Sequence, residues 1–292
     1  EELAEWLGWF IGEGTFNLKE SVGFCNWDPA VVERMTDLTR TVFGLCMRRS
    51  SDHNYFIGSG ILQRWLRRIG ADGLAADKRV PDAVLQSPES HQVAFLRALF
   101  EAEGCISVRP HERAIELATA SKTMARQVQI MLLNFGVVVA RRTKVATTKR
   151  WGQRTYWRLA ISGQNVISFR ERLGFMAGSE KQRTLETLNE TAIGWDLDGL
   201  PTEFVMPRYA DIRQAMRDAD LERDRIFWHR SATMTVRRAW SGQRGARGLV
   251  ARSVIERGLK LFADVSTCPA YCEIQKELAS GRIWETVVAV DD

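Results

Sequence analysis

The chain contains two copies of one unit, and this duplication constrains its fold more than any other feature. The segment LGWFIGEG at residues 7–14 recurs in pattern as RALFEAEG at residues 97–104. Each segment has the apolar spacing of a helix, ends in Glu-Gly and is followed by a short run typical of a strand. Internal similarity of this kind indicates that the chain uses one supersecondary unit twice.

Further landmarks recur downstream in the same order in both copies. They are Phe43-Gly44 and Phe135-Gly136 at a helix end, the turns at residues 57–60 and 161–164, the helix-closing Gly70 and Gly174, and finally Lys78 and Lys181. The spacing of the apolar residues between these landmarks predicts the order of elements αββαββα in each copy. We therefore expect an α+β fold with one repeat at residues 1–90 and a second repeat at residues 91–195.

Residues 196–292 lack this pattern and are predicted to form a smaller, mainly helical domain. Pro201 and Pro207 indicate a linker at its start. Helical runs are expected at residues 208–219 and 247–262, and an Arg-Gly-rich run at residues 237–247 lies between them.

Small residues lie four positions apart in both motif segments: Gly8 and Gly12, then Ala98 and Ala102. Residues at this spacing share one face of a helix, so they predict a close contact between the two helices. If the two helices pair in parallel, their C-terminal ends bring Glu13 and Glu103 together.

An acid is poorly placed at a helix C-terminus. The partial negative charge there disfavours a carboxylate by about 0.3–1 kcal/mol, and two converging carboxylates also repel each other. Because carboxylate oxygens suit Mg²⁺, a divalent cation between Glu13 and Glu103 would relieve both conflicts. Two ordinary, solvated helix ends are the alternative interpretation.

The two segments resemble the LAGLIDADG motif of homing endonucleases, and the resemblance covers about residues 3–190. Its acid-Gly end corresponds to Glu13-Gly14 and to Glu103-Gly104, and the second copy, FLRALFEAEG at residues 95–104, is the closer match. The family more often has Asp where this chain has Glu.

The resemblance implies a Mg²⁺-dependent endonuclease that cuts both strands of a long, asymmetric DNA duplex as a monomer. Mn²⁺ would substitute for Mg²⁺, and Ca²⁺ would support binding without cleavage. The implied catalytic residues are Glu13, Glu103, Lys78 and Lys181. The implied metal-binding residues are Glu13, Glu103 and the residues before them, Gly12 and Ala102. The lysines would stabilise charge or tune the water network.

In this family the strands of both repeats form a saddle whose concave face reads the major groove. The candidate DNA-binding residues are polar or basic residues of the strand-like runs: Asn17, Lys19, Asn26, Arg48, Arg49 and His53 in the first copy, and Arg109, Glu116, Arg141, Lys144, Lys149, Arg150, Arg154 and Arg158 in the second. Four more lie in the Arg-Gly-rich run: Arg237, Arg238, Arg244 and Arg247. Since successive strand residues face opposite sides, we expect about half of the strand residues to face DNA.

Composition agrees with a nucleic-acid partner without proving one. The net charge is +5 and the pI is about 9.1. Five cysteines form no regular framework, so a reducing, cytoplasmic setting is expected rather than a disulfide scaffold. No apolar stretch predicts a membrane span.

The last stretch, residues 283–292, resembles the strand that resumes an intein splicing domain after an endonuclease insert. The arrangement of Lys78-x-x-Pro81 followed by Phe95-Leu96 also resembles that in intein-borne members of the family. Because the N-terminal Cys or Ser and the C-terminal His-Asn of splicing are missing, we expect no splicing, and the start at Glu1 suggests a segment of a longer protein. The rival prediction is a catalytically silent LAGLIDADG-like maturase or transcription regulator.

Overall fold

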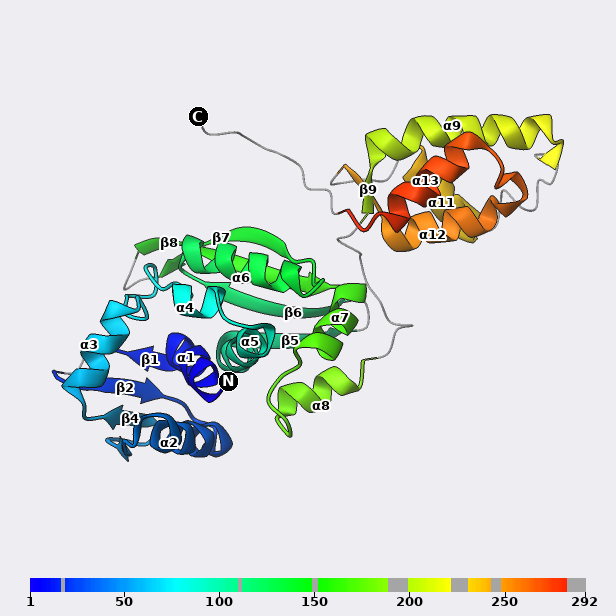
Figure 1. Cartoon of the computed structure of the whole chain (residues 1–292). Helices are drawn as coiled ribbons and strands as arrows, with labels where there is room; N and C mark the ends of the chain where they lie inside the picture. The colour runs from blue at the N-terminus through cyan, green and yellow to red at the C-terminus, as the bar shows by residue number, and fades with distance from the viewer. Residues whose placement is uncertain are drawn as a thin grey trace. The chain divides into compact units, whose positions relative to one another are not determined.

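The computed structural model describes residues 1–16, 19–109, 112–148, 152–188, 199–221, 231–242 and 248–282. Contacts between residues divide the chain into two compact units, Glu1–Gly194 and Trp195–Asp292 (Figure 1).

The first unit contains the string αββαββα twice, as the repeat predicts. The first copy consists of α1 (Glu2–Glu13), β1 (Gly14–Thr15), β2 (Val22–Cys25), α2 (Pro29–Phe43), β3 (Met47–Arg49), β4 (Asn54–Ile57) and α3 (Gly60–Arg68). The second consists of α5 (Glu89–Glu103), β5 (Gly104–Arg109), β6 (Glu112–Thr119), α6 (Lys122–Asn134), β7 (Ala140–Thr148), β8 (Gly152–Ser162) and α7 (Gln164–Arg172). A short helix follows each copy: α4 (Asp82–Leu85) and α8 (Glu180–Glu186).

Each copy forms a four-stranded antiparallel sheet with the same strand order. The orders are β1-β2-β4-β3 and β5-β6-β8-β7. The strands of the second sheet are longer, reaching 11 residues in β8 against 4 in β2 and β4. The second repeat therefore offers the larger sheet surface.

Local sequence signals begin corresponding helices in the same way. The Asp28 carboxylate accepts the backbone N–H of Ala30 at the start of α2, and the Ser121 hydroxyl accepts that of Met124 at the start of α6. These oxygens satisfy N–H groups that lack a partner within the helix.

The motif glycines do not end their helices in the left-handed conformation that often closes a helix. Gly14 and Gly104 are extended, with φ of −78° and −79°. Glycine is needed there for space: a Cβ would lie 2.3 Å from the Phe10 carbonyl oxygen and 2.4 Å from that of Phe100. The chain passes directly from each helix into a strand.

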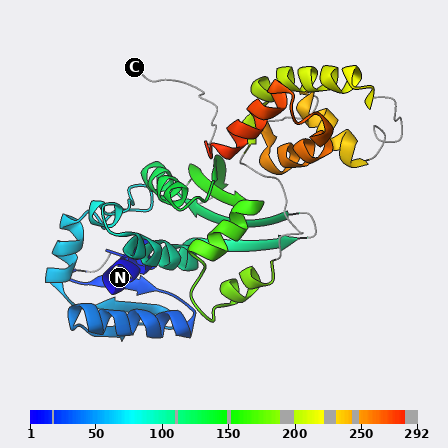
Figure 2. The same cartoon turned by 45° about the vertical axis from the view of Figure 1, so that its right-hand side comes forward.

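Helices α1 and α5 lie side by side between the two sheets (Figures 1 and 2). A Cβ on Gly8 would lie 2.9 Å from the Ala98 Cβ, and one on Gly12 would lie 2.6 Å from the Ala102 Cβ. The contact from Gly8 to Ala98 and the contact from Gly12 to Ala102 are four residues apart in the same direction along both helices, so the helices run in parallel. The predicted small-residue contact is therefore present.

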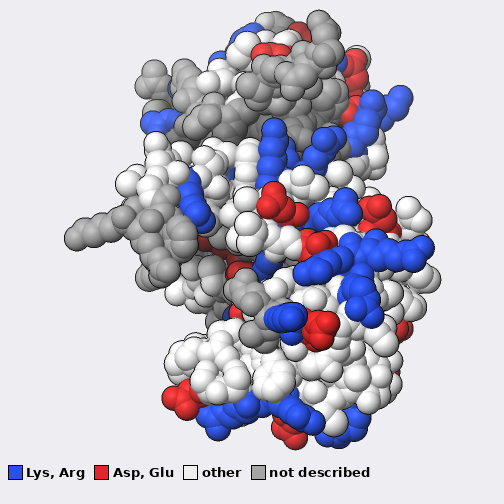
Figure 3. All heavy atoms as spheres, turned by 90° about the vertical axis from the view of Figure 1, so that its left-hand side faces the viewer, with Lys and Arg blue, Asp and Glu red and all other residues white. Residues whose placement is uncertain are grey.

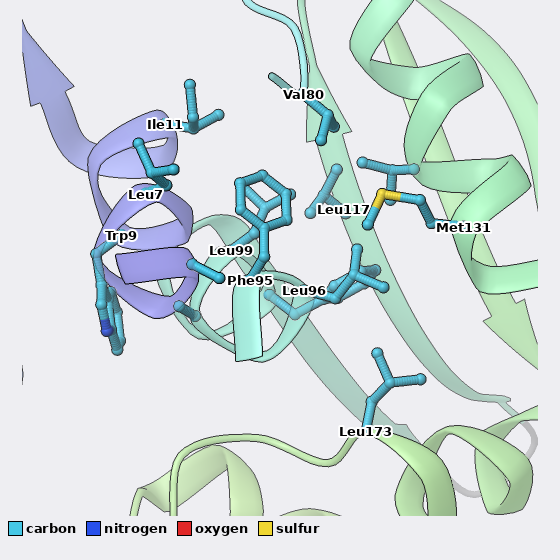
Figure 4. Packing of buried hydrophobic residues seen from close by; sticks show 14 of the residues in the cluster. Leu7, Trp9, Ile11, Val80, Phe95, Leu96, Leu99, Leu117, Met131 and Leu173 are labelled. Atoms are coloured by element: carbon cyan, nitrogen blue, oxygen red, sulfur yellow. The ribbon is translucent and has the colours of Figure 1, made fainter. Parts of the chain in front are cut away.

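One hydrophobic core joins the two repeats around these helices. Figure 4 shows side chains from α1, α5 and β6 meeting in this core, among them Leu7, Phe95 and Leu117. All three are at most 3% exposed, so one face of each motif helix is anchored in this core.

The second unit has its own core, formed by Tyr209, Trp240, Ile255, Phe262 and other buried residues. Its elements are β9 (Gly199–Pro201), α9 (Thr202–Asp218), α11 (Ser231–Trp240), β10 (Leu249–Ala251), α12 (Arg252–Leu261), the 3-10 turn η3 (Ala263–Val265) and α13 (Pro269–Ala279). Strands β9 and β10 pair antiparallel. Among the described residues, no helix is long and apolar enough to cross a membrane.

Two expectations for this region were wrong. Pro207 does not lie in a linker but inside α9, in its second turn, where its missing N–H removes one bond of the helix ladder. Arg237 and Arg238 do not lie between helices as expected, since both occupy the last turn of α11.

Candidate active site

The ends of α1 and α5 bring Glu13 and Glu103 into one site. The Glu103 Cγ would lie 3.4 Å from a Cβ placed on Gly12, the neighbour of Glu13. Both carboxylates also lie close enough to Lys78 and Lys181 to be influenced by their charges. The four residues predicted to be catalytic thus converge.

The surroundings disfavour the charged form of both acids. Burial, and then the nearby charge of Glu103, raises the pKa of Glu13 to about 7. Burial also raises the pKa of Glu103, although its side chain keeps contact with solvent. Two carboxylates of raised pKa at helix C-termini favour a cation between them.

The two lysines approach from the segments that follow each repeat. The Lys78 ammonium donates to the Gly12 carbonyl oxygen at 2.8 Å, and the Lys181 ammonium donates to the Glu101 carbonyl oxygen. Burial lowers the pKa of both lysines, against the opposing effect of the neighbouring acids. The two halves are not identical, because the position that matches Gly12 is Ala102 rather than Glu101.

Asn26 adds a neutral donor to one half of the site. It follows β2, and its side-chain amide donates to the Glu13 carboxylate across 3.5 Å. The strand pairings place Thr119 at the matching position of the second repeat, and that hydroxyl is buried and contacts the Met124 sulfur instead. The sequence marked Asn26 only as a strand residue that could read DNA, because its contact with Glu13 depends on sheet pairing.

The donor set fits a hard divalent cation bound partly by water or substrate. Within the described ranges no cluster of three or more His, Cys, Asp or Glu side chains exists. Two carboxylates are nevertheless typical of Mg²⁺ sites, where water and phosphate oxygens supply the remaining ligands. Gly12 and Ala102 pack against each other at the helix contact, and the Gly12 carbonyl already accepts from Lys78. Their role as metal ligands remains a prediction.

The register of the second sheet separates the candidate readers by face. Arg142 pairs with Arg158 and Lys144 with Tyr156, so these side chains share one face. Arg142 and Lys144 are exposed. Arg154 belongs to the same face, because it pairs with Ala146.

Arg141 lies on the opposite face, contrary to expectation. It pairs with the buried Leu159, and its guanidinium lies 5.7 Å from the centre of the Trp157 ring. A shift of one residue reverses the face of a strand side chain, so Arg142 replaces Arg141 as the candidate reader.

The first sheet shows the same division. Arg48 pairs with Phe56 on the face opposite the buried Val22 and Ile57, whereas Arg49 pairs with Tyr55 on the core side. Arg49 also donates to the carbonyl oxygens of Ser51 and Asp52 at 3.0 and 3.1 Å. The guanidinium of Arg49 is therefore used within the β3–β4 turn, and its role in reading DNA stays a prediction.

The remaining candidates of the first unit occupy turns and ion pairs. Lys19 is exposed in the turn before β2, and the His53 ring stacks on Trp27 at 3.7 Å. Arg158 forms an ion pair with Glu116, so those two side chains neutralise each other. Figure 3 shows one side of the molecule, where basic side chains lie among acidic ones.

Residues 90–174 match the family model of the LAGLIDADG-like domain. This part of the chain is therefore similar to that domain. It begins within α5 and ends after α7, so it covers the helix that carries Glu103 and the whole second sheet.

The relatives of this chain are much longer proteins, and each matches it over only a part of its own length. The replication factor C small subunit of Methanocaldococcus jannaschii is 30% identical over 245 residues, which is 80% of this chain and 13% of that protein. The corresponding protein of Thermococcus kodakarensis is 31% identical over 80% of this chain and 26% of its own length. A DNA gyrase subunit of Mycobacterium kansasii is 34% identical over 46% of this chain and 26% of its own length. The aligned part spans at most 26% of the length of these relatives.

Similar solved structures were also found. The crystal structure of I-DmoI in complex with DNA and Mn has a TM-score of 0.46 and 17% identity, and covers 59% of this chain and 95% of its own. Full-length DUF199/WhiA has a TM-score of 0.43 and 12% identity, and covers 98% of this chain and 93% of its own.

Some candidates lie outside the described residues. These are Asn17, Lys149, Arg150, Arg244, Arg247 and the terminal stretch 283–292. Arg109 is placed by its backbone alone, at the end of β5 in the LAGLIDADG-like domain.

Glu13 should make the stability of the metal-free protein depend on pH. The folded state keeps the Glu13 proton up to about pH 7, whereas an unfolded glutamate loses it near pH 4.5. Stability therefore falls as pH rises through this window and levels off above about 7. We expect Glu13→Gln to raise the Tm by about 2–6 °C at pH 8 in EDTA, after allowing for solvent screening, and by much less at pH 5. Calorimetry at both pH values measures this difference, and equal shifts at pH 5 and pH 8 would contradict it.

Proposed function

We propose that the chain is a site-specific DNA endonuclease that makes metal-dependent double-strand breaks in a long, asymmetric duplex. The observation that carries the proposal is the convergence of Glu13 and Glu103 at the ends of two parallel helices, each with a lysine beside it. A purely structural contact would gain nothing from two acids of raised pKa at helix C-termini.

Glu13 and Glu103 would hold the divalent ion, with Mg²⁺ as the proposed physiological ion and Mn²⁺ as a substitute. When bound, such an ion polarises a phosphate and lowers the pKa of its water. Lys78 and Lys181 would stabilise the negative charge that develops on the phosphate, as compact cations that hydrogen bonds hold in position. Asn26 would orient the Glu13 carboxylate.

The exposed faces of the two sheets would bind the major groove on either side of the site, forming the proposed saddle. Arg48, Arg142, Lys144 and Arg154 supply the cations that suit guanine edges and phosphates. Because both carboxylates belong to one chain, we propose that a monomer is the active form. The exposed Arg237 and Arg238 of α11 would add sequence-independent affinity.

The chain would be carried inside host proteins as the endonuclease segment of an intein. Support comes from relatives as different as replication factor C, DNA gyrase and DNA polymerase, each of which matches over only a small part of its length. A segment found in proteins with unrelated activities is expected of a mobile insertion. Its natural target would then be the host gene without the insert.

The test is incubation of the purified chain with the insert-free host sequence and with a randomised duplex library, in Mg²⁺, followed by sequencing of the ends. Cleavage at one defined site supports the proposal. Specific binding without cutting in Mg²⁺ or Mn²⁺ would overturn it in favour of a silent, regulatory LAGLIDADG-like protein.

The division of strand faces makes a prediction about DNA affinity. We expect Arg142→Ala with Lys144→Ala to weaken binding and to reduce the slope of log affinity against log salt by about 1–2, because each phosphate contact contributes about 0.9. Fluorescence anisotropy across a KCl series measures the slope. Arg141→Ala is the matched control, which should lower the Tm through its lost contact with Trp157 and leave the slope unchanged. A larger change of slope for Arg141→Ala would contradict the assigned register.

A further inference from the structure

A buried carboxylate next to the proposed site has no part in the chemistry described so far. Glu101 is 8% exposed, and its Oε2 accepts the backbone N–H of Met176 at 2.8 Å and the Ser179 hydroxyl at 3.0 Å. Burying a carboxylate costs free energy unless it is hydrogen-bonded, and bonds to a charged acceptor are the stronger kind. These two bonds join α5 to a segment 75 residues further along the chain.

That segment carries Lys181 into the site. The Ser179 hydroxyl also accepts the backbone N–H of Gln182, so it caps α8, whose second residue is Lys181. The Lys181 ammonium in turn donates to the Glu101 backbone carbonyl. Glu101 therefore holds the segment with its side chain and the lysine with its backbone.

A second residue of α5 supports the same segment. Arg97 lies one helical turn before Glu101, and its Nε donates to the Leu173 carbonyl oxygen at 2.8 Å. Positions four apart share a helix face. One face of α5 thus holds residues 173–181, while Ala98 and Ala102 pack against α1.

The first repeat does not use this arrangement. Its matching positions, Leu7 and Ile11, are buried apolar residues of the core. The segment after Lys78 is held instead by Gln127 of α6, which accepts the Val80 N–H at 2.9 Å and donates back to the Val80 carbonyl. The two lysines therefore have separate supports.

We propose that Glu101 is a positioning residue that serves Lys181 alone, so that its loss converts the double-strand endonuclease into a nickase. The inference rests on the proposed function. It predicts that one strand loses its cleavage while the other is still cut, which a general loss of stability would not produce.

The experiment follows each strand of the target with a separate fluorescent end label. Lys181→Met first identifies the strand whose cleavage depends on Lys181. Glu101→Ala should then slow cleavage of that strand by about 100-fold, the order of effect expected from a displacement of about 1 Å, and change the other strand by less than about threefold. Glu101→Gln should remain within about tenfold of wild type, because its amide oxygen can still accept the Met176 N–H.

Three further variants separate positioning from stability. If Glu101 acts through Lys181, adding Glu101→Ala to Lys181→Met should cause no further loss on that strand. The matched control is Gln127→Ala, which should leave the Lys181-dependent strand unchanged. If Glu101→Ala does not fold, Ser179→Ala should slow the same strand by about tenfold, because it removes one of the two bonds to Oε2.

Equal losses on both strands, or additive losses in the double variant, would overturn the proposal. If the wild-type chain cuts neither strand, the proposed function fails and Glu101 is tested by amine labelling instead. Glu101→Ala should then change the labelling rate of Lys181 and not that of Lys78. An unchanged Lys181 rate would overturn the positioning role as well.

Discussion

Glu13→Gln and Glu103→Gln should each abolish double-strand cleavage in Mg²⁺. Glutamine keeps the shape of the side chain but removes the charge that would hold the cation, and metal stabilisation contributes several kcal/mol. This corresponds to a loss of about a thousand-fold or more in the rate of linear product formation. Single-turnover cleavage of a plasmid that carries the target measures this rate.

DNA binding should remain within about tenfold in both variants, since the proposed DNA-binding faces lie on the two sheets. Ca²⁺ should support binding without cutting, because its larger and more flexible shell positions an attacking water poorly. Glu33→Gln is the matched control, an exposed acid of α2 away from the helix contact, and should cut like the wild type. Undiminished linear product from either active-site variant would remove the metal site as the basis of the proposal.

Gly8→Ala should destabilise the first unit, although alanine is normally the better helix former by about 1 kcal/mol. The added Cβ would lie 2.3 Å from the Phe95 carbonyl oxygen and 2.9 Å from the Ala98 Cβ. Neither neighbour can move without separating α1 from α5, and overpacking of this kind costs about 1–3 kcal/mol. For a unit of this size we expect a fall in Tm of about 2–12 °C, measured by calorimetry.

Gly58→Ala provides the matched control for this substitution. No atom lies within 4 Å of a Cβ at Gly58, so its Tm should change by less than about 2 °C. Gly8→Ala should also slow cleavage, because separated helices would alter the spacing of Glu13 and Glu103. A Tm equal to wild type would show that the two helices do not pack as closely as described.

Local patterns in the sequence were enough to predict the repeated αββαββα units and the close contact of the motif helices. Both depend on short-range periodicity: apolar residues one helical turn apart define the helices, and the small residues at 8, 12, 98 and 102 define their contact. The position of Glu13 and Glu103 at the helix ends follows from the same pattern, because each acid directly precedes the glycine at which its strand begins.

Tertiary structure decided what depends on pairing across the chain. A one-residue difference in register separates Arg142 on the exposed face from Arg141 on the core face, and residue type alone cannot distinguish two adjacent arginines. Residue type likewise suggests that Arg49 reads DNA, whereas in the folded chain its guanidinium donates to carbonyl oxygens of the β3–β4 turn. The role inferred for Glu101 depends on Met176 and Ser179, which reach it only after the second repeat has folded. Sequence periodicity determines which face of an element is buried, whereas hydrogen-bond partners far apart in the chain are determined only when the elements pack.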